Sequence, residues 1–231
     1  MGSIPRDGGS PCSGLVVGGV LLAAGSASRM GHKPKALLEL GGVPLIRRHL
    51  IALSGAGLNE LVVVLGHHAE HLEPLVRDLP ITLVRNPEPD LGQVSSQRLG
   101  LQALSGKPDA VIVALADQPL VGAQDYIDLI GAYNKRPRGT EVVVPTVGDL
   151  PGNPVMFSTL VRQAVLAEQA QIGCKQWQAR NPQAVYRWPT ENKHYRQDVD
   201  SPEDIEQLAL LTGQRLSWPP AWRDGRPTVS Q

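Results

Sequence analysis

Short apolar runs alternate with amphipathic segments along most of the chain. The runs are short and rich in β-branched residues, a pattern typical of strands that are covered on both faces. Between them, apolar positions three and four residues apart predict helices. The expected strands cover 20–24, 60–65, 81–84, 110–115, 141–144 and 184–188. The expected helices cover 44–53, 69–79, 95–104, 123–133, 160–168, 175–180 and 202–212.

This alternation predicts the fold class. At least four strand–helix alternations at short intervals favour right-handed βαβ crossovers, and so a Rossmann-like α/β fold. We expect an open, mainly parallel sheet with helices on both faces. A single domain is expected over 19–213, between a flexible leader (1–18) and a tail (214–231). Ligands of such sheets bind beyond the carboxyl ends of the strands, where the polar loops of this sequence lie.

The first strand runs into a loop of small residues and cations. Residues 20–31 have the sequence VLLAAGSASRMG, and Lys33-Pro34-Lys35 follows. Small side chains let a ligand approach the backbone, and Arg29, Lys33 and Lys35 can meet phosphate oxygens. The spacing matches neither G-x-x-x-x-G-K-[ST] nor G-x-G-x-x-G. The loop therefore predicts a phosphate site of another kind, with a basic surface loop as the alternative.

Two acidic segments are candidates for a metal site. Asp117 directly follows an apolar strand, so its carboxylate reaches the edge of the sheet, where it can ligate Mg²⁺ together with substrate phosphates. Its alternative role is to cap the next helix. Asp198 and Asp200 precede a capping box that opens at Ser201 with proline at the first helical position. Asp200 could equally well only favour the dipole of that helix.

Composition and charge narrow the class of ligand. The 22 basic and 22 acidic residues leave no global basic field for nucleic acid, and no segment has the apolar length of a membrane span. Cys12 and Cys174 form no disulfide framework, so a reduced, cytoplasmic setting is expected. The leader lacks the features of a secretory signal. His67, His68 and His71 favour a solvated helix start over a metal site. A small phosphorylated ligand fits these features best.

The motif L-A-A-G-x-x-x-R-M-G-x-x-x-K resembles the signature of nucleotidyltransferases that transfer NMP from an NTP. It is most similar to the molybdopterin nucleotidyltransferase family, and within it to the cytidylyltransferase branch. Asp117-Gln118-Pro119 resembles the D-Q-P or D-M-P motif of this family, and residues 198–204 resemble D-x-D-T-P-E-D with Ser in place of Thr. The resemblance covers about residues 20–210 and implies a fold like that of the nucleotide-diphospho-sugar transferases.

The resemblance also implies roles for individual residues. Arg29, Lys35 and Asp117 would be catalytic, and Asp117 with Asp200 would hold Mg²⁺. Residues 86–96 resemble a second nucleotide loop, with a plain loop and a helix cap as the alternative. Residues 152–157 resemble the G-x-P-x-x-F segment associated with the second substrate, with a turn before a core strand as the alternative. The implied acceptor-binding residues are Gly152, Asn153 and Pro154. The implied nucleotide-binding residues are Leu22, Ala23, Ala24, Gly25, Arg29, Lys35, Asn86, Ser95, Ser96 and Asp117.

The implied reaction is transfer of CMP from CTP to the molybdenum-molybdopterin cofactor, with Mg²⁺ and release of pyrophosphate. Ala23-Ala24-Gly25 and Ser95-Ser96 favour CTP over GTP within the family. The sequence departs from the family pattern at residues 171–177, which replace a G-D-x-G-A-R-like stretch, and this departure concerns the pterin substrate rather than the nucleotide. A guanylyltransferase, a sugar- or alditol-phosphate nucleotidyltransferase, an NAD(P)-dependent oxidoreductase and a non-catalytic cofactor-delivery protein remain alternatives. A molybdoenzyme or its chaperone would be the partner protein.

Overall fold

The structure, a computed structural model, describes residues 14–168 and 172–223. Most of the expected leader, the final residues of the expected tail and Gln171 lie outside the described residues. The first strand, β1 (Val17–Ala23), begins just before the expected start of the domain. Within the described residues, no helix is long and apolar enough to cross a membrane.

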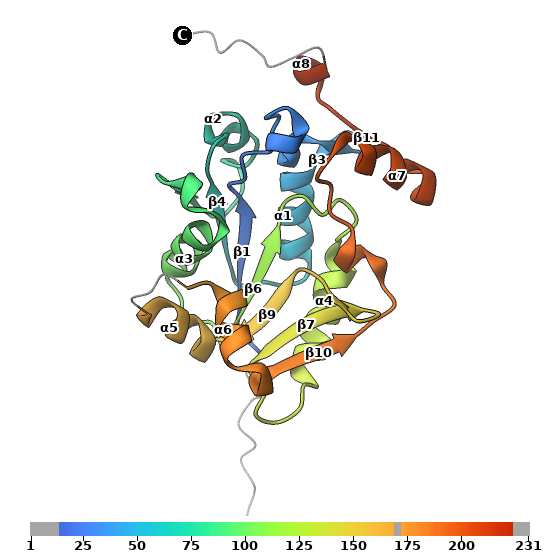
Figure 1. Ribbon diagram of the computed structural model, residues 1–231. Coiled ribbons are helices and arrows are strands. Elements are labelled where there is room, and N and C mark those ends of the chain that lie inside the picture. The colour runs from blue at the N-terminus through green and yellow to red at the C-terminus, as the bar shows by residue number, and fades with distance from the viewer. Residues whose placement is uncertain (1–13, 169–171, 224–231) are drawn as a thin grey trace, which may run out of the picture.

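The central sheet has the strand order β10-β7-β9-β6-β1-β4-β5, with β8 paired to β7 (Figure 1). The pairs β1–β4, β1–β6, β4–β5 and β7–β10 are parallel, whereas β9 is antiparallel to both of its neighbours. A mainly parallel sheet is therefore confirmed. Its strands are β1, β4 (Glu60–Leu65), β5 (Thr82–Arg85), β6 (Ala110–Leu115), β7 (Val142–Val147), β8 (Leu150–Pro151), β9 (Val155–Ser158) and β10 (Val185–Pro189).

Helices cover both faces of this sheet. Leu21 of β1 packs in the core layer under α1 and α4, whereas Val20 packs in the layer under α3 and α5. Each central strand is apolar at consecutive positions because it supplies side chains to both layers. The helices are α1 (Leu45–Gly55), α2 (Ala69–Leu72), α3 (Gln93–Ala103), α4 (Ala123–Asn134), α5 (Thr159–Ala167), α6 (Cys174–Arg180), α7 (Pro202–Thr212) and α8 (Pro220–Arg223).

A second, three-stranded sheet lies beside residues 24–35, which follow β1 and are called the signature loop below. It has the order β11-β2-β3 and consists of β2 (Glu39–Leu40), β3 (Val43–Pro44) and β11 (Leu216–Ser217). Leu216 and Trp222, both in the expected tail, are buried against this domain. Lys33 is held here, since its Nζ donates to the Trp222 carbonyl at 2.8 Å. Residues 214–223 thus pack on the domain of their own chain.

Two expectations about individual elements were wrong. The helix expected over 69–79 is the four-residue α2 followed by a 3-10 turn at Glu73–Leu75, because Pro74 lacks the N–H that a continuing helix needs. Ser95 and Ser96 do not cap α3, which starts at Gln93 after Gly92 with φ +85°. The alternative interpretation of residues 152–157, a turn before a core strand, agrees with β9, whose four residues are all buried.

Candidate active site

The signature loop folds back on itself directly after β1. Backbone N–H groups of Met30 and His32 donate to the Ala27 carbonyl at 2.9 and 3.0 Å. Ala27 and His32 have left-handed φ values of 50° and 59°, unusual for residues with a side chain. Met30 is buried beside Leu38 and anchors the loop in a small core cluster, which leaves Arg29 exposed beyond it.

Four charged side chains meet at the end of this loop. Lys35 Nζ lies 2.6 Å from Asp117 Oδ2 and 2.7 Å from Asp200 Oδ1. Arg29 Nη2 lies 3.1 Å from the other oxygen of Asp200. The residues come from the signature loop, the end of β6 and the segment before α7. The structure therefore brings together the predicted catalytic residues and the predicted metal ligands.

The two aspartates of the last segment differ in their surroundings. The hydrogen bond and charge of Lys35, together with Arg29, hold the pKa of Asp200 below its ordinary value. Burial raises the pKa of Asp198, and repulsion from Asp117 and Asp200 adds to this rise. Burial alone would lower the pKa of Lys35, but Asp117 and Asp200 raise it. Asp200, rather than Asp198, is thus the carboxylate that joins the cluster.

The carboxylates fit a hard divalent cation. Asp117 Oδ1 is buried and has no hydrogen-bond partner among the described residues, although such atoms are normally satisfied. This free oxygen and the neighbouring Asp200 are the kind of ligand that Mg²⁺ prefers. The part of the chain that the structure describes holds no group of three His, Cys, Asp or Glu suited to a metal. Water and phosphate oxygens would therefore complete the coordination, as is usual for Mg²⁺.

A cavity of about 440 Å³ opens beside this cluster, between the signature loop and the loop before α3. Leu22, Ala24, Gly25, Ser96 and Asp117, all predicted nucleotide-binding residues, line it. The other predicted nucleotide-binding residues, which are Ala23, Arg29, Lys35, Asn86 and Ser95, are not part of its lining.

Asn86 stabilises the predicted second nucleotide loop, residues 86–96, through its side-chain hydrogen bonds. Its side-chain amide donates to the hydroxyl oxygens of Ser95 and Ser96 at 2.7 and 2.8 Å, and its Oδ1 accepts from the Glu88 N–H at 2.9 Å. Since Asn86 is buried and uses both ends of its amide in these bonds, the structure places it as a support of the loop. Direct contact between Asn86 and a nucleotide stays a prediction.

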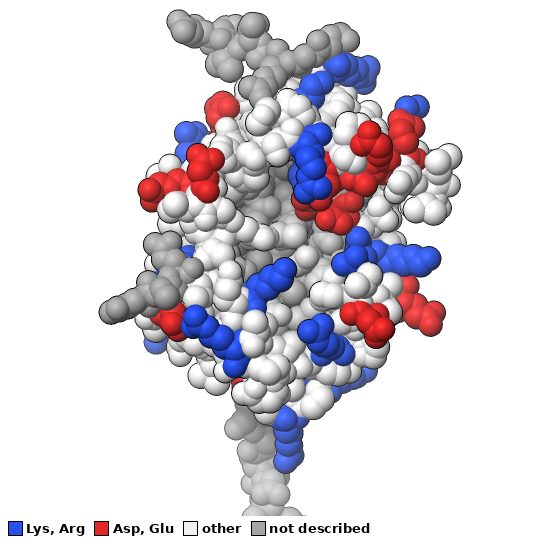
Figure 2. Space-filling view, viewed as in Figure 1, with Lys and Arg blue, Asp and Glu red and all other residues white. Residues whose placement is uncertain are grey.

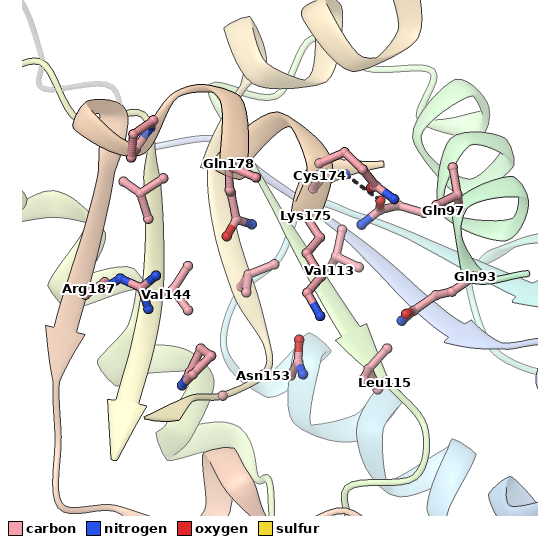
Figure 3. A pocket seen from close by; sticks show the side chains of 18 of the residues that line it. Gln93, Gln97, Val113, Leu115, Val144, Asn153, Cys174, Lys175, Gln178 and Arg187 are labelled. Carbon is pink, nitrogen blue, oxygen red and sulfur yellow. Dashed lines mark hydrogen bonds between the residues drawn. The ribbon is translucent and has the colours of Figure 1, made fainter. Parts of the chain in front are cut away.

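A second cavity of about 630 Å³ adjoins the first and shares Gln93 and Leu115 with it (Figure 3). Gly152 and Asn153 line this cavity, whereas Pro154 is buried and does not. A Cβ atom on Gly152 would lie 2.4 Å from the Tyr195 carbonyl oxygen, so the backbone can pass there only without a side chain. The predicted acceptor segment thus forms part of a cavity next to the nucleotide cavity.

Sequence reasoning missed several residues of these cavities. His67 and Gln93 line the nucleotide cavity, and Lys175 and Arg187 line the second one. His67 could have been found, because it lies two residues after a parallel strand next to β1, where ligands bind. Lys175 and Arg187 carry no such signal, since their place depends on how the last third of the chain folds over the sheet.

The neighbouring histidines serve three different contacts. His67 Nε2 lies 3.4 Å from an Asp90 carboxylate oxygen, and His68 Nε2 lies 3.3 Å from the Ser26 carbonyl oxygen. His71 packs edge-on against the ring of Trp222, with 4.8 Å between ring centroids. The three histidines thus point to three different neighbours.

Charge is divided between the two ends of the hollow (Figure 2). Acidic side chains gather at one side, next to the α7 region, while Lys and Arg side chains stand around the lower half. In the site itself, Asp117 and Asp200 are paired with Lys35 and Arg29, whereas the charged residues in the lining of the second cavity are all cations. This division suits a cation and its phosphates at one end and an anionic molecule at the other.

Comparison with known proteins gives matches over most of the chain. The model of the MobA-like NTP transferase domain matches residues 19–185. The chain is 34% identical over 137 residues to the bifunctional protein GlmU of Mycobacterium ulcerans (strain Agy99), over 56% of this chain and 28% of GlmU. It is 29% identical over 204 residues to nicotine blue oxidoreductase of Paenarthrobacter nicotinovorans, over 86% of this chain and 97% of that protein. The chain thus spans less than a third of GlmU.

Solved structures share the fold. Rv0371c of Mycobacterium tuberculosis H37Rv matches with a TM-score of 0.70 and 23% identity, over 84% of this chain and 97% of that chain. Molybdopterin-guanine dinucleotide biosynthesis protein A of Archaeoglobus fulgidus matches with a TM-score of 0.61 and 15% identity, over 85% and 98%. Since the family model covers more than half of the sequence, this chain belongs to the family of MobA-like NTP transferase domains, a nucleotidyltransferase family.

Proposed function

We propose that this chain transfers CMP from CTP to the terminal phosphate of a molybdenum-molybdopterin cofactor, in the cytoplasm. The observation that carries the proposal is the position of Lys35, 2.6 and 2.7 Å from Asp117 and Asp200, because Asp117 lines the first cavity and the second cavity adjoins it. An NTP in the first cavity would present its phosphates to this cluster. An acceptor in the second cavity would approach from the other side.

The reaction forms one bond and breaks one. An acceptor phosphate oxygen attacks the α-phosphorus of CTP in line, and the bond from that phosphorus to the β-phosphate oxygen breaks, which releases pyrophosphate. The acceptor phosphate is already ionised at neutral pH, so no general base is required. Positioning and charge neutralisation dominate such transfers.

Each charged residue has a distinct task in this mechanism. Arg29 is exposed and ends beside Asp200, so it can turn toward the β- and γ-phosphates as they enter. Lys35 balances the charge of Asp117 and Asp200 and faces the departing pyrophosphate. Asp117, through its free Oδ1, and Asp200 would hold Mg²⁺, which supplies charge neutralisation at the reacting phosphate.

Similar folds support CTP as the donor. One structural neighbour is described as CMP:2-keto-3-deoxy-manno-octonic acid synthetase complexed with CTP, with a TM-score of 0.61 and 16% identity. Another is described as 4-diphosphocytidyl-2C-methyl-D-erythritol synthase, with a TM-score of 0.66 and 17% identity. At these identities the support is at the level of the fold. A sugar- or alditol-phosphate acceptor, and GTP as donor, are therefore the outcomes that the test must separate.

A second candidate function is oxidoreduction with NAD(P). The match to nicotine blue oxidoreductase extends over 97% of that protein at 29% identity and favours this alternative. The cluster of Lys35, Asp117 and Asp200 argues against it, because hydride transfer needs no paired carboxylates around a phosphate-binding lysine. Nucleotide binding distinguishes the two functions directly.

The test is calorimetry with CTP, GTP, ATP and NADH, each with and without Mg²⁺, followed by pyrophosphate release with a panel of phosphorylated acceptors. We expect Mg²⁺-dependent preference for CTP and turnover only with the pterin cofactor. The matched variants are Asp117→Asn and Asp149→Asn, since Asp149 is exposed in the turn between β7 and β8 and lines neither cavity. Binding of NADH alone, or a CTP affinity that Mg²⁺ and Asp117→Asn leave unchanged, would contradict the proposal.

A further inference from the structure

The second cavity has cationic and amide side chains in its wall and no acidic residue in its lining. Three of its lining residues, Lys175, Arg187 and Arg196, are cations, and none of the described lining residues is Asp or Glu. Its floor consists of apolar strand residues, among them Val113 and Val144. A cavity with this lining suits a molecule that has an apolar or flat body and negative charge.

Two of these cations have no partner of their own. Arg196 Nη1 donates to the Pro151 carbonyl at 2.9 Å, whereas the side chains of Lys175 and Arg187 make no hydrogen bond or ion pair with any described residue. Arg180, on the same short helix as Lys175, shows the contrast, because it pairs with Glu168 at 3.1 Å. The two unpaired cations are therefore available to an incoming anion.

The side chains of Lys175 and Arg187 converge on the cavity from different elements. Lys175 comes from α6 and points toward Asn153, while Arg187 comes from β10 and extends over the floor beside Val144 (Figure 3). The amide of Gln178 hangs into the same space. Lys175 and Gln178 thus border the same cavity as Arg187, and Arg187 occupies a position at the end of the cavity that lies over β10.

This position lies far from the reacting phosphate. Arg187 is on β10, three strands away from β6, whose carboxyl end carries Asp117. At a spacing of about 4.8 Å between neighbouring strands, the two strands are about 14 Å apart. An anion held by Arg187 is therefore not the phosphate that receives CMP.

We propose that the acceptor carries a second anionic group, distant from its reacting phosphate, and that Lys175 and Arg187 bind this group. The inference rests on the proposed function, because it takes the second cavity to be the acceptor site. Lys175 and Arg187 would then select among phosphorylated acceptors, while Asp117 and Lys35 serve the nucleotide. The apolar floor would carry the body of the acceptor between its two charged ends.

The experiment uses two probes of equal length with the full chain. One is an eight-carbon diol with a phosphate at one end and a free hydroxyl at the other; the second carries phosphates at both ends. Affinities are measured by calorimetry with the wild type, Arg187→Gln, Lys175→Gln and the double variant. Arg180→Gln is the matched control, because it removes a cation that is already paired and lies outside the cavity lining.

We expect the bisphosphate to bind the wild type and Arg180→Gln at least tenfold more tightly than the monophosphate. Each cavity substitution should reduce this ratio severalfold, and the double variant should bind the two probes equally. Equal affinities in the wild type, failure of both probes to bind, or a ratio that survives the double substitution would overturn the inference. CTP affinity is measured separately and reports on the proposed function. If the wild type does not bind CTP but still prefers the bisphosphate to the monophosphate, the cytidylyl transfer is refuted and the anion site remains.

Discussion

Gly66 lies so close to Ala24 that a Cβ atom on it would be 2.5 Å from the Ala24 carbonyl oxygen. Gly66 follows β4, and Ala24 follows β1, the neighbouring parallel strand. The contact lies at the carboxyl end of the sheet, where Ala24 forms part of the nucleotide cavity. The position of the signature loop therefore depends on a glycine that is distant from it in the sequence.

We predict that Gly66→Ala displaces the signature loop and weakens CTP binding at least tenfold. The added methyl group would also meet the Cβ of Ala24 at 2.8 Å, so the loop rather than a flexible side chain must move. The matched control is Gly131→Ala in α4, where an added Cβ meets nothing within 4 Å. That control should stabilise the helix by up to about 1 kcal/mol. Calorimetry with CTP decides, and wild-type affinity in Gly66→Ala would contradict the assigned contact.

The charge cluster predicts a large loss of activity for Lys35→Ala. Loss of one preorganised electrostatic contact typically lowers turnover by about 10²–10³. Lys35 also separates the charges of Asp117 and Asp200, which would be left unbalanced. Rates of pyrophosphate release are compared with those of Lys107→Ala, an exposed lysine outside both cavities. Circular dichroism should show both proteins folded, and near-normal turnover of Lys35→Ala would refute its role.

The two aspartates before α7 should respond differently to substitution. Asp200→Asn should lower turnover by at least tenfold and raise the Mg²⁺ concentration required, because Asp200 contacts both Lys35 and Arg29. Asp198→Asn removes a carboxylate that is repelled by its neighbours, so its effect should be small. Titration of pyrophosphate release with Mg²⁺ compares the two variants. A larger defect in Asp198→Asn would assign the second metal ligand to Asp198.

Buried His49 makes the stability depend on pH. Burial, together with the charge of nearby Arg48, lowers the pKa of His49 to about 4, and the Nδ1 atom of His49 lies 2.8 Å from the Tyr126 hydroxyl. In the unfolded chain the pKa is about 6.5. The unfolded state therefore binds the proton first as the pH falls, and the contribution of His49 to stability, about 3 kcal/mol, is fully present above pH ~6.5 and lost toward pH ~4.

Denaturant unfolding between pH 4 and 7 tests this linkage. We compare the wild type with His49→Gln, which cannot titrate in this range. The free energy of unfolding of the wild type should fall more steeply with decreasing pH, whatever the difference at neutral pH. Parallel curves for the two proteins would mean that His49 is not the responsible group.

Two arginines exchange contacts between α3 and α5. Arg98 of α3 donates to carbonyl groups at the end of α5, including those of Leu166 and Glu168 at 3.2 and 3.3 Å. Arg162 of α5 donates to the carbonyl groups of Leu101 and Leu104 at the end of α3, at 2.9 and 2.5 Å. Each side chain thus satisfies terminal carbonyl groups of the other helix, which have no partner within their own helix.

We predict that Arg98→Met lowers stability by about 2 kcal/mol, because several charge-assisted hydrogen bonds are lost while the aliphatic part of the side chain is retained. In a chain of this size the corresponding fall in Tm is about 4–8 °C. Thermal unfolding is compared with that of Arg77→Met, because Arg77 is exposed in the turn that follows Leu75 and lines neither cavity. Equal Tm values for the two variants would rule out the capping role of Arg98.

Local patterns determined the central part of the fold. The strands 60–65 and 110–115 have the bounds that their sequences predicted, because a parallel strand covered on both faces is apolar along its buried length, which here excludes only Glu60 at the start of the first strand. The small, cationic loop after β1 and the carboxylate of Asp117 after β6 were predicted because each directly follows an apolar strand in the sequence. A few neighbouring residues are enough to predict a strand and the charged loop that follows it.

The tertiary structure decided which residues that are far apart in the sequence come into contact. Lys35 meets Asp117 and Asp200 across 82 and 165 residues, and no local pattern encodes such a distance. The insertion of β9 as an antiparallel strand between β6 and β7 depends on its neighbours, since its own sequence fits either direction equally well. Asn86 supports its loop from behind because the start of α3 brings Ser95 and Ser96 to its amide. The sequence by itself thus determined which groups reach the edge of the sheet, and the packing of the chain decided which of them meet.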